Sequence, residues 1–571
     1  MATFGERFLL GFTSPRNPRL ISQYVKVIEK YNLDGMKYDI NFQELFYDVL
    51  SKEKVAGVET GTAKDKALAG RDKLTRMPQA LGFFITQSNK NFKITDAGNL
   101  LKDDNLFEDV LLHQMLKYQL PSPLHKEKQN NKNYFRIKPF LELLRLIDKL
   151  DYLTYNEFLT YGMTFTHYKN FDNVVRDIIN YRNIRKIVKQ QNQSLREFDH
   201  QNRVNIFKIL YKDILATGNY NTRESRTTTA EQYVNKKMRN LFDYADSIFR
   251  VLQASGIVVF SGGRSLRINP KRKDEVNYIL KNVSREILPI DTKRDQFDKY
   301  ISDPCQPILL NDSKENILVA LSKLGDTSSN HKQDIYELKA KLNKLRDEQK
   351  HNLVLQQVSE LKTKRDTDIN DIINTFKQIS NKEIEPASMR PTYFEWNVWR
   401  AMTMINHGNV VGNFIVDDLG NPISTAGGGK SDIIGDYGIF KIGVEVTLST
   451  GMKQYDMEGE PVVRHIGELQ QKGPAFGLFI ADTLNDNVIN HFYLTSLANS
   501  DIFKGRVDVI PMDTKTFINF FEKAVKKDLT PNDLLKIHNH SLNTSMQNLM
   551  SGKTEKNWHE SVLNNINNIV S

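Results

Sequence analysis

The chain has 571 residues, a formal net charge of +10 and one cysteine, Cys305. This length is too great for one hydrophobic core and predicts two to four domains, while a single cysteine excludes an internal disulfide framework and a thiolate zinc site built from this chain alone. No segment has the roughly 18 uncharged apolar residues of a membrane helix, and the N-terminus lacks a signal-peptide pattern, so we expect a cytoplasmic protein without a membrane partner.

Charge is divided unevenly along the chain. Residues 1–300 carry 50 Lys and Arg against 35 Asp and Glu, whereas residues 301–571 carry 29 against 34. A basic half suits binding to a polyanion, and an acidic half suits metal-dependent chemistry. A chance gradient of solvated surface charge is the alternative interpretation.

Residues 1–300 alternate helical patterns with short hairpins. One hairpin is predicted over residues 82–95, before a helix that starts at Asp96. A second is predicted over residues 256–269, with Gly262 and Gly263 at its turn, after an amphipathic helix over residues 238–254. Both fit the wing of a winged helix-turn-helix, and residues 141–182 could form a further such unit. We therefore predict a mainly α, winged-helix-like DNA-recognition region over residues 1–300, although winged helices also serve as protein-interaction modules.

Basic residues cluster where these units would meet DNA. Arginine pairs with guanine edges and lysine mostly meets phosphate, but a solvated helix face explains any single residue equally well. The run 271–273 belongs to this cluster, and the individual candidates for DNA binding are Arg16, Arg19, Arg71, Lys73, Arg76, Arg223, Arg226, Arg264 and Arg267.

Residues 301–388 are predicted to form a helical connector, because the segment is polar with helical periodicity but lacks sustained heptads. The breaker at residues 384–391 marks the boundary of a C-terminal domain over residues 389–571. That domain is predicted to begin with a helix over residues 392–406. Glu395 lies near its expected first turn, where the helix dipole favours a carboxylate even without a function.

Two further acids follow on predicted neighbouring strands. After a strand over residues 410–416 and a glycine-rich run, Asp432 opens one strand, and Glu445 lies on the polar face of the next, half-buried strand over residues 439–448. Two carboxylates on adjacent strands can hold a divalent metal ion, as in a nuclease, because a buried acid needs a cation or water beside it. Many surface hairpins also carry two acids, so the order of the surrounding elements carries more weight than the pair.

This order resembles the α/β fold of PD-(D/E)XK nucleases, with Asp432 and Glu445 as the first and second acids. The motif lysine would stand at Thr447, and Lys453 or Gln454 are candidates to replace it. The next helix is expected to start at Pro461 and to carry His465. A lone histidine is more often a satisfied structural group than a catalytic one.

Short runs at residues 394–396, 443–447 and 457–465, and at 13–18 and 94–98, resemble the AlwI and BstNBI group of Type IIS restriction endonucleases, which includes PleI and MlyI. The resemblance implies a short asymmetric site in double-stranded DNA, GGATC-like or GAGTC-like, and Mg²⁺-dependent cleavage a few base pairs outside it. It also implies a transient homodimer or a small second subunit for double-strand cleavage. The implied catalytic residues are Glu395, Asp432, Glu445, Glu458 and His465, of which Asp432, Glu445 and Glu458 are the metal ligands; Glu460 is the alternative to Glu458.

Other functions remain open at this stage. The chain could be a strand-specific nicking endonuclease or the large subunit of a heterodimeric enzyme. A transposase-like or repair nuclease would share the catalytic fold. A non-catalytic winged-helix regulator would explain the basic half but would leave the ordered acids unexplained.

Overall fold

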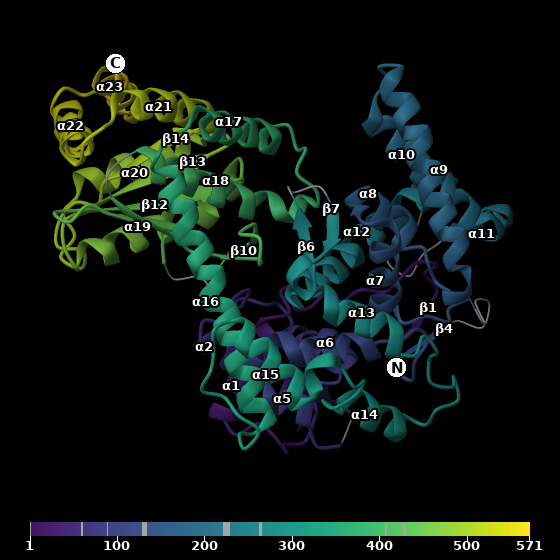
Figure 1. Cartoon of the computed structure of the whole chain (residues 1–571). Coiled ribbons are helices and arrows are strands. Elements are labelled where there is room, and N and C mark those ends of the chain that lie inside the picture. The colour runs from purple at the N-terminus through teal and green to yellow at the C-terminus, as the bar shows by residue number, and fades with distance from the viewer. Residues whose placement is uncertain are drawn as a thin grey trace. The chain divides into compact units, whose positions relative to one another are not determined.

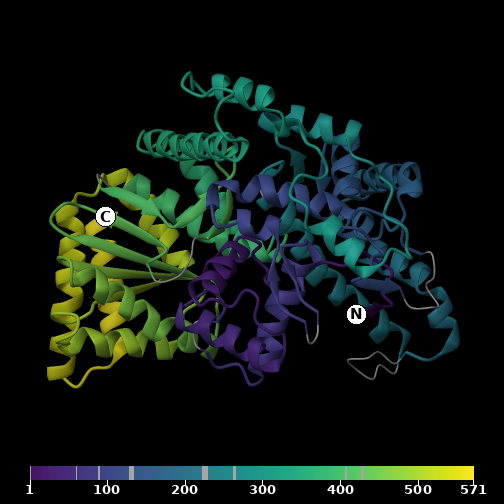
Figure 2. The same ribbon diagram turned by 90° about the horizontal axis from the view of Figure 1, so that it is seen from below.

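The computed structural model describes residues 2–58, 61–87, 90–127, 134–220, 229–261, 265–405, 408–425 and 430–571. The chain forms two compact units, Met1–Gln349 (unit 1) and Lys350–Ser571 (unit 2), coloured from purple to yellow in Figures 1 and 2. The division falls within α16 (Ile335–Leu361), inside the segment predicted as a helical connector. Across the described parts of the chain, no helix combines the length and apolar character needed to cross a membrane.

Unit 1 is mostly helical. Its cores are built from helices with apolar stripes, such as α7, whose aliphatic residues are almost all buried. The helices are α1 (Leu20–Lys30), α2 (Ile40–Lys52), α3 (Lys66–Thr75), α4 (Met77–Ala80), α5 (Asp96–Leu100), α6 (Phe107–Lys117), α7 (Pro139–Leu150), α8 (Tyr155–Glu157), α9 (Phe171–Gln190), α10 (Leu195–Leu210), α11 (Lys212–Thr217), α12 (Ala230–Ala254), α13 (Lys273–Asn282), α14 (Arg294–Ser302) and α15 (Lys314–Lys323).

Both predicted hairpins of unit 1 are present. In the first, β2 (Phe84–Ile85) pairs antiparallel with β3 (Lys93–Ile94), and the Thr95 side chain caps α5 at the predicted start. In the second, β6 (Val258–Ser261) pairs antiparallel with β7 (Ser265–Ile268) after α12. The predicted Gly262 and Gly263 turn lies outside the described residues. A short parallel pair, β1 (Ala2–Phe4) with β4 (His125–Glu127), completes the strands near the N-terminus.

Residues 141–182 do not form a further unit with a hairpin of their own. Their strand β5 (Leu153–Thr154) pairs with β7, so the sheet order is β5-β7-β6. The pairing joins strands more than a hundred residues apart, which local sequence patterns do not reveal. The second hairpin and α7 therefore belong to one subdomain, whose labelled elements can be followed in Figure 1.

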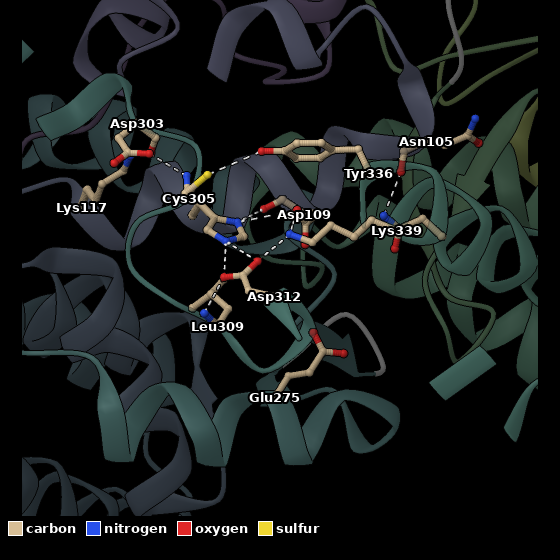
Figure 3. A network of polar contacts seen from close by, with 12 residues as sticks. Asn105, Asp109, Lys117, Glu275, Asp303, Cys305, Leu309, Asp312, Tyr336 and Lys339 are labelled. Atoms are coloured by element: carbon tan, nitrogen blue, oxygen red, sulfur yellow. Dashed lines mark hydrogen bonds and ion pairs between the residues drawn. The ribbon is translucent and has the colours of Figure 1, made fainter. Parts of the chain in front are cut away.

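A buried polar network attaches the first half of α16 to α6 and to the segment before α15 (Figure 3). Lys339 Nζ donates to Asp109 Oδ2 at 2.9 Å and to Asp312 Oδ1 at 2.6 Å, and His113 Nε2 lies 3.0 Å from Asp312 Oδ2. Burial alone would raise the pKa of Asp312, but His113 and Lys339 lower it to about 2. The paired charges fix this part of α16 within unit 1.

Unit 2 contains a five-stranded mixed sheet in the order β14-β13-β12-β11-β8. The antiparallel part comprises β8 (Asn409–Gly412), β11 (Ile433–Asp436) and β12 (Lys441–Thr447), and the parallel part extends from β12 to β13 (Ala475–Ala481) and β14 (Val509–Asp513). β13 is buried throughout and continuously apolar, as expected of a central parallel strand.

Two groups of helices pack on this sheet. α18 (Arg390–Ile405) contacts β8, β11 and β12, beside α17 (Asp366–Ser380) and α21 (Thr514–Lys527). α19 (Met452–Gln470) and α20 (Asp486–Leu497) contact β12, β13 and β14, and α22 (Pro531–Met550) and α23 (Glu555–Val570) pack beside α20. The crossovers that hold α19 and α20 join neighbouring parallel strands, which places both helices on one face.

Three predictions for unit 2 need correction. α18 starts at Arg390, so Glu395 lies beyond the first turn, where the helix dipole does not account for it. The strand predicted over residues 410–416 breaks at Asn413 into β8 and β9 (Phe414–Val416), and β9 pairs separately with β10 (Pro422–Thr425). α19 starts at Met452 and contains Pro461, which was expected to begin it. The predicted apolar stripe of α18 is buried, as expected.

Candidate active site

Asp432 and Glu445 face each other across two hydrogen-bonded strands. Ile433 pairs with Val444, so the preceding Asp432 lies opposite Glu445 in the antiparallel register. Asp432 Oδ2 accepts a hydrogen bond from the Val446 amide at 2.8 Å, which fixes its orientation. Burial and the charge of Glu445 raise the pKa of Asp432 well above its usual range. The local arrangement therefore holds two carboxylates together in spite of their repulsion.

Strand β12 is buried on both faces, and the prediction of a half-buried strand is wrong. Glu445 is 6% exposed because α19 covers the face that carries Gly443, Glu445 and Thr447. A Cβ atom at position 443 would lie 2.4 Å from Ile466 Cδ1, so glycine permits the close approach of α19. Glu445 is consequently held in a largely desolvated position.

Helix α19 supplies two side chains to this face. Glu458 and His465 are seven residues apart, so they share one side of the helix. Thr447 Oγ1 donates to Glu458 Oε1 at 2.7 Å, and His465 Nδ1 lies 3.0 Å from Glu445 Oε1. Burial and the charge of Glu445 raise the pKa of Glu458, against the lowering effects of Thr447 and His465. The structure thus brings both predicted α19 residues to the Asp432–Glu445 pair.

Glu395 reaches the same group of carboxylates from α18. It is 8% exposed, and its Oε2 atom is buried without a hydrogen-bond partner in the described part of the protein. Burial, followed by the charges of Asp432, Glu445 and Glu458, raises the pKa of Glu395 to about 10. A buried, unsatisfied carboxylate is costly unless a proton, a cation or water accompanies it.

The residues proposed to replace the motif lysine have different environments. Gln454 is fully buried, and its Nε2 atom donates to the carbonyl oxygens of Ser449 and Thr483, both at 2.8 Å. Its Oε1 atom accepts from the Asn485 amide at 2.8 Å. Gln454 therefore holds together the loops after β12 and β13, while Lys453 is exposed on the first turn of α19. Sequence patterns gave no indication of the Gln454 contacts.

The donor set fits a hard divalent cation such as Mg²⁺. Among the described residues, no group of three or more Asp, Glu, His or Cys side chains is gathered as a ready metal site. Mg²⁺, however, usually takes one or two protein carboxylates and completes its shell with water and substrate phosphate. Asp432 and Glu445 supply two such carboxylates, and the orphaned Glu395 oxygen supplies another acceptor nearby.

The described DNA-binding candidates lie in unit 1 and have partners within it. Arg16 forms an exposed ion pair with Asp243, whereas Arg19 pairs with Glu108 and lies over the Phe107 ring. Three candidates occupy α3 and its C-terminal end: Arg71, Lys73 and Arg76, the last of which donates to Thr13 and Asp72. Arg267 lies on β7 and pairs with Asp151. Arg223, Arg226 and Arg264 fall outside the described residues.

Comparison with known proteins identifies the class of this molecule. The family model of the AlwI restriction endonuclease matches residues 79–520. No curated protein matches the chain. The small subunit (R.BspD6I2) of the heterodimeric restriction endonuclease R.BspD6I matches with 28% identity and a TM-score of 0.27, over 35% of this chain and 98% of that one. The BpuJ1 endonuclease binding domain, solved with pyrene- and phenanthrene-modified DNA, matches with 13% identity and a TM-score of 0.32, over 50% and 92%.

The match over residues 79–520 covers most of both units. The protein is accordingly a restriction endonuclease, a DNA-binding and site-specific deoxyribonuclease. The chain belongs to the AlwI restriction endonuclease family.

Proposed function

We propose that this protein is a Type IIS restriction endonuclease of the AlwI and BstNBI group. It binds a short asymmetric site, GGATC-like or GAGTC-like, and hydrolyses phosphodiester bonds a few base pairs outside it. The observation that carries the proposal is the pair of carboxylates Asp432 and Glu445, opposed across β11 and β12 with Glu395 and Glu458 close by. The mixed sheet between two helical layers supports a PD-(D/E)XK-like nuclease domain.

The acidic residues take distinct roles in this proposal. Asp432 and Glu445 would hold Mg²⁺, and Glu458 would complete its coordination. Bound Mg²⁺ supplies activation of water and neutralises charge that develops on the phosphate. Thr447 orients Glu458, and His465 orients Glu445 through their hydrogen bonds. Glu395, whose buried Oε2 atom has no hydrogen-bond partner among the described residues, positions the attacking water.

Unit 1 reads the DNA site in this proposal. Each of its two described hairpins lies beside helices, which supports winged-helix-like subdomains, and the excess of basic residues over residues 1–300 supports contact with phosphates. One active site per chain cuts one strand. Double-strand cleavage therefore requires a second copy or a small second subunit, and a chain acting alone nicks.

Digestion of a mapped plasmid with Mg²⁺, followed by run-off sequencing of both strands, tests this function. The expected result is breaks at one fixed offset from one short sequence, and the same experiment distinguishes nicking from double-strand cleavage. Breaks without a fixed distance from a sequence would contradict the Type IIS assignment.

A further inference from the structure

An exposed Arg–Asp pair joins Arg267 on β7, the central strand of the β5-β7-β6 sheet in unit 1, to Asp151 at the end of α7. Arg267 donates to Asp151 Oδ2 at 2.7 Å, and the two side chains are 41% and 80% exposed. Exposed ion pairs add little to stability. A contribution to stability therefore does not explain why Arg267 and Asp151 are held in fixed positions.

The guanidinium of Arg267 is fixed from two directions. Leu153 of β5 pairs with Leu266 of β7, so Tyr152 comes opposite Arg267, whose guanidinium lies 5.0 Å from the Tyr152 ring centroid. The Tyr152 ring is itself held by Arg182, 4.0 Å from the centroid, which is anchored to the buried Glu157 at 2.8 Å. A fixed guanidinium loses less conformational freedom when it binds a ligand.

Asp151 adopts a backbone conformation that residues other than glycine seldom adopt. It ends α7 with φ 67° and ψ −31°, which an L-residue adopts only at a cost in free energy. This conformation holds an exposed carboxylate beside the fixed guanidinium of Arg267. A carboxylate at a surface that binds phosphates is unfavourable unless it accepts a hydrogen bond from the DNA itself.

We propose that Arg267 and Asp151 together read one G·C base pair of the recognition site in the major groove. The planar fork of Arg267 donates to guanine O6 and N7, and the Asp151 carboxylate accepts from cytosine N4. Tyr152 is a positioning residue for Arg267. This inference rests on the proposed function and adds to it the residues that read a defined base pair.

Binding by the full-length chain to a panel of duplexes tests the pair, once run-off sequencing has given the site of the unaltered enzyme. In each duplex one G·C pair of that site is replaced. Asp151→Asn removes a negative charge, so binding to unrelated DNA stays equal or tightens. Binding to the complete site weakens roughly 10- to 100-fold, and discrimination at one G·C pair disappears. Arg267→Lys keeps the charge but loses the fork, and discrimination at the same pair disappears.

Asp148→Asn is the matched control. Asp148 lies on α7 three residues before Asp151 and pairs with Lys273 at the surface. This variant keeps discrimination at every position. The inference is overturned if Asp151→Asn tightens binding to the site and to unrelated DNA by the same factor, or if Arg267→Lys retains discrimination. Absence of any fixed site for the unaltered enzyme would overturn the proposed function, and this inference with it.

Discussion

Thr447 Oγ1 donates a hydrogen bond to Glu458 Oε1 at 2.7 Å, at the position where the proposed PD-(D/E)XK-like site would have a lysine. In the proposed site, this hydroxyl orients the Glu458 carboxylate of α19 where the motif would place a positive charge. Thr447→Val keeps the side-chain shape but frees Glu458, and we expect a single-turnover cleavage rate lower by roughly 10- to 100-fold. Thr447→Ser keeps the hydroxyl and most of the rate. Equal rates for the two variants would contradict this role.

Glu395→Gln is expected to stabilise the metal-free protein while abolishing cleavage. The pKa of Glu395 is raised to about 10 from 4.5, so the folded chain keeps a proton that the unfolded chain releases. This contribution to stability is complete below the unfolded pKa and is lost as the pH rises toward the folded value. The amide in Glu395→Gln does not ionise, so the variant does not lose this stability as the pH rises. In EDTA the free energy of unfolding should rise on the order of 1–3 kcal/mol at about pH 8.5, and by less at about pH 5. A gain that does not grow with pH would contradict the account.

His465→Ala is expected to weaken the binding of Mg²⁺ to the active site. The imidazole lies 3.0 Å from Glu445 Oε1 and orients that carboxylate. Its removal should raise the Mg²⁺ concentration for half-maximal cleavage roughly 10- to 100-fold, with recovery of the rate at high Mg²⁺. A titration of Mg²⁺ at saturating DNA measures this. A lowered rate that no Mg²⁺ concentration restores would assign His465 to the chemical step instead.

Lys339→Met is expected to destabilise unit 1 strongly. The Lys339 side chain is 4% exposed and pairs with Asp109 and Asp312, so its loss leaves two partly buried carboxylates without this cation. Breaking such a buried pair costs about 3–5 kcal/mol. Lys341→Met is the control two residues further along α16, because Lys341 is 33% exposed and its partner Asp326 keeps hydrogen bonds from Ser328 and Ser329. Thermal unfolding of both variants measures their losses of stability. Equal losses would contradict a stabilising role for the Lys339 network.

The sequence predicted those features that local patterns determine. The buried stripe of α18, the two hairpins of unit 1 and the succession of Asp432 and Glu445 on neighbouring strands all follow from periodicity and turn residues. The continuation of α19 through Pro461 did not follow, because packing of its apolar face against the sheet outweighs the proline's local cost.

Contacts between distant segments were not predictable in the same way. The basic run 271–273 was expected to face DNA, but Arg272 is 3% exposed and pairs with Glu275 and Glu108. A run of charged residues is expected to be exposed to solvent when only the sequence is known, because its ion-pair partners in distant segments are not visible there. The pairing of β5 with β7 and the contact between Thr447 and Glu458 likewise depend on the tertiary fold.

The most direct test of the account is plasmid cleavage and DNA binding by Asp432→Ala, measured side by side with the unaltered enzyme. Asp432 lies opposite Glu445 and accepts the Val446 amide, so the variant removes one of the two opposed carboxylates without touching unit 1. We predict that cleavage in Mg²⁺ falls below detection while binding to the recognition site is retained. Cleavage that survives the substitution would show that the active site lies elsewhere.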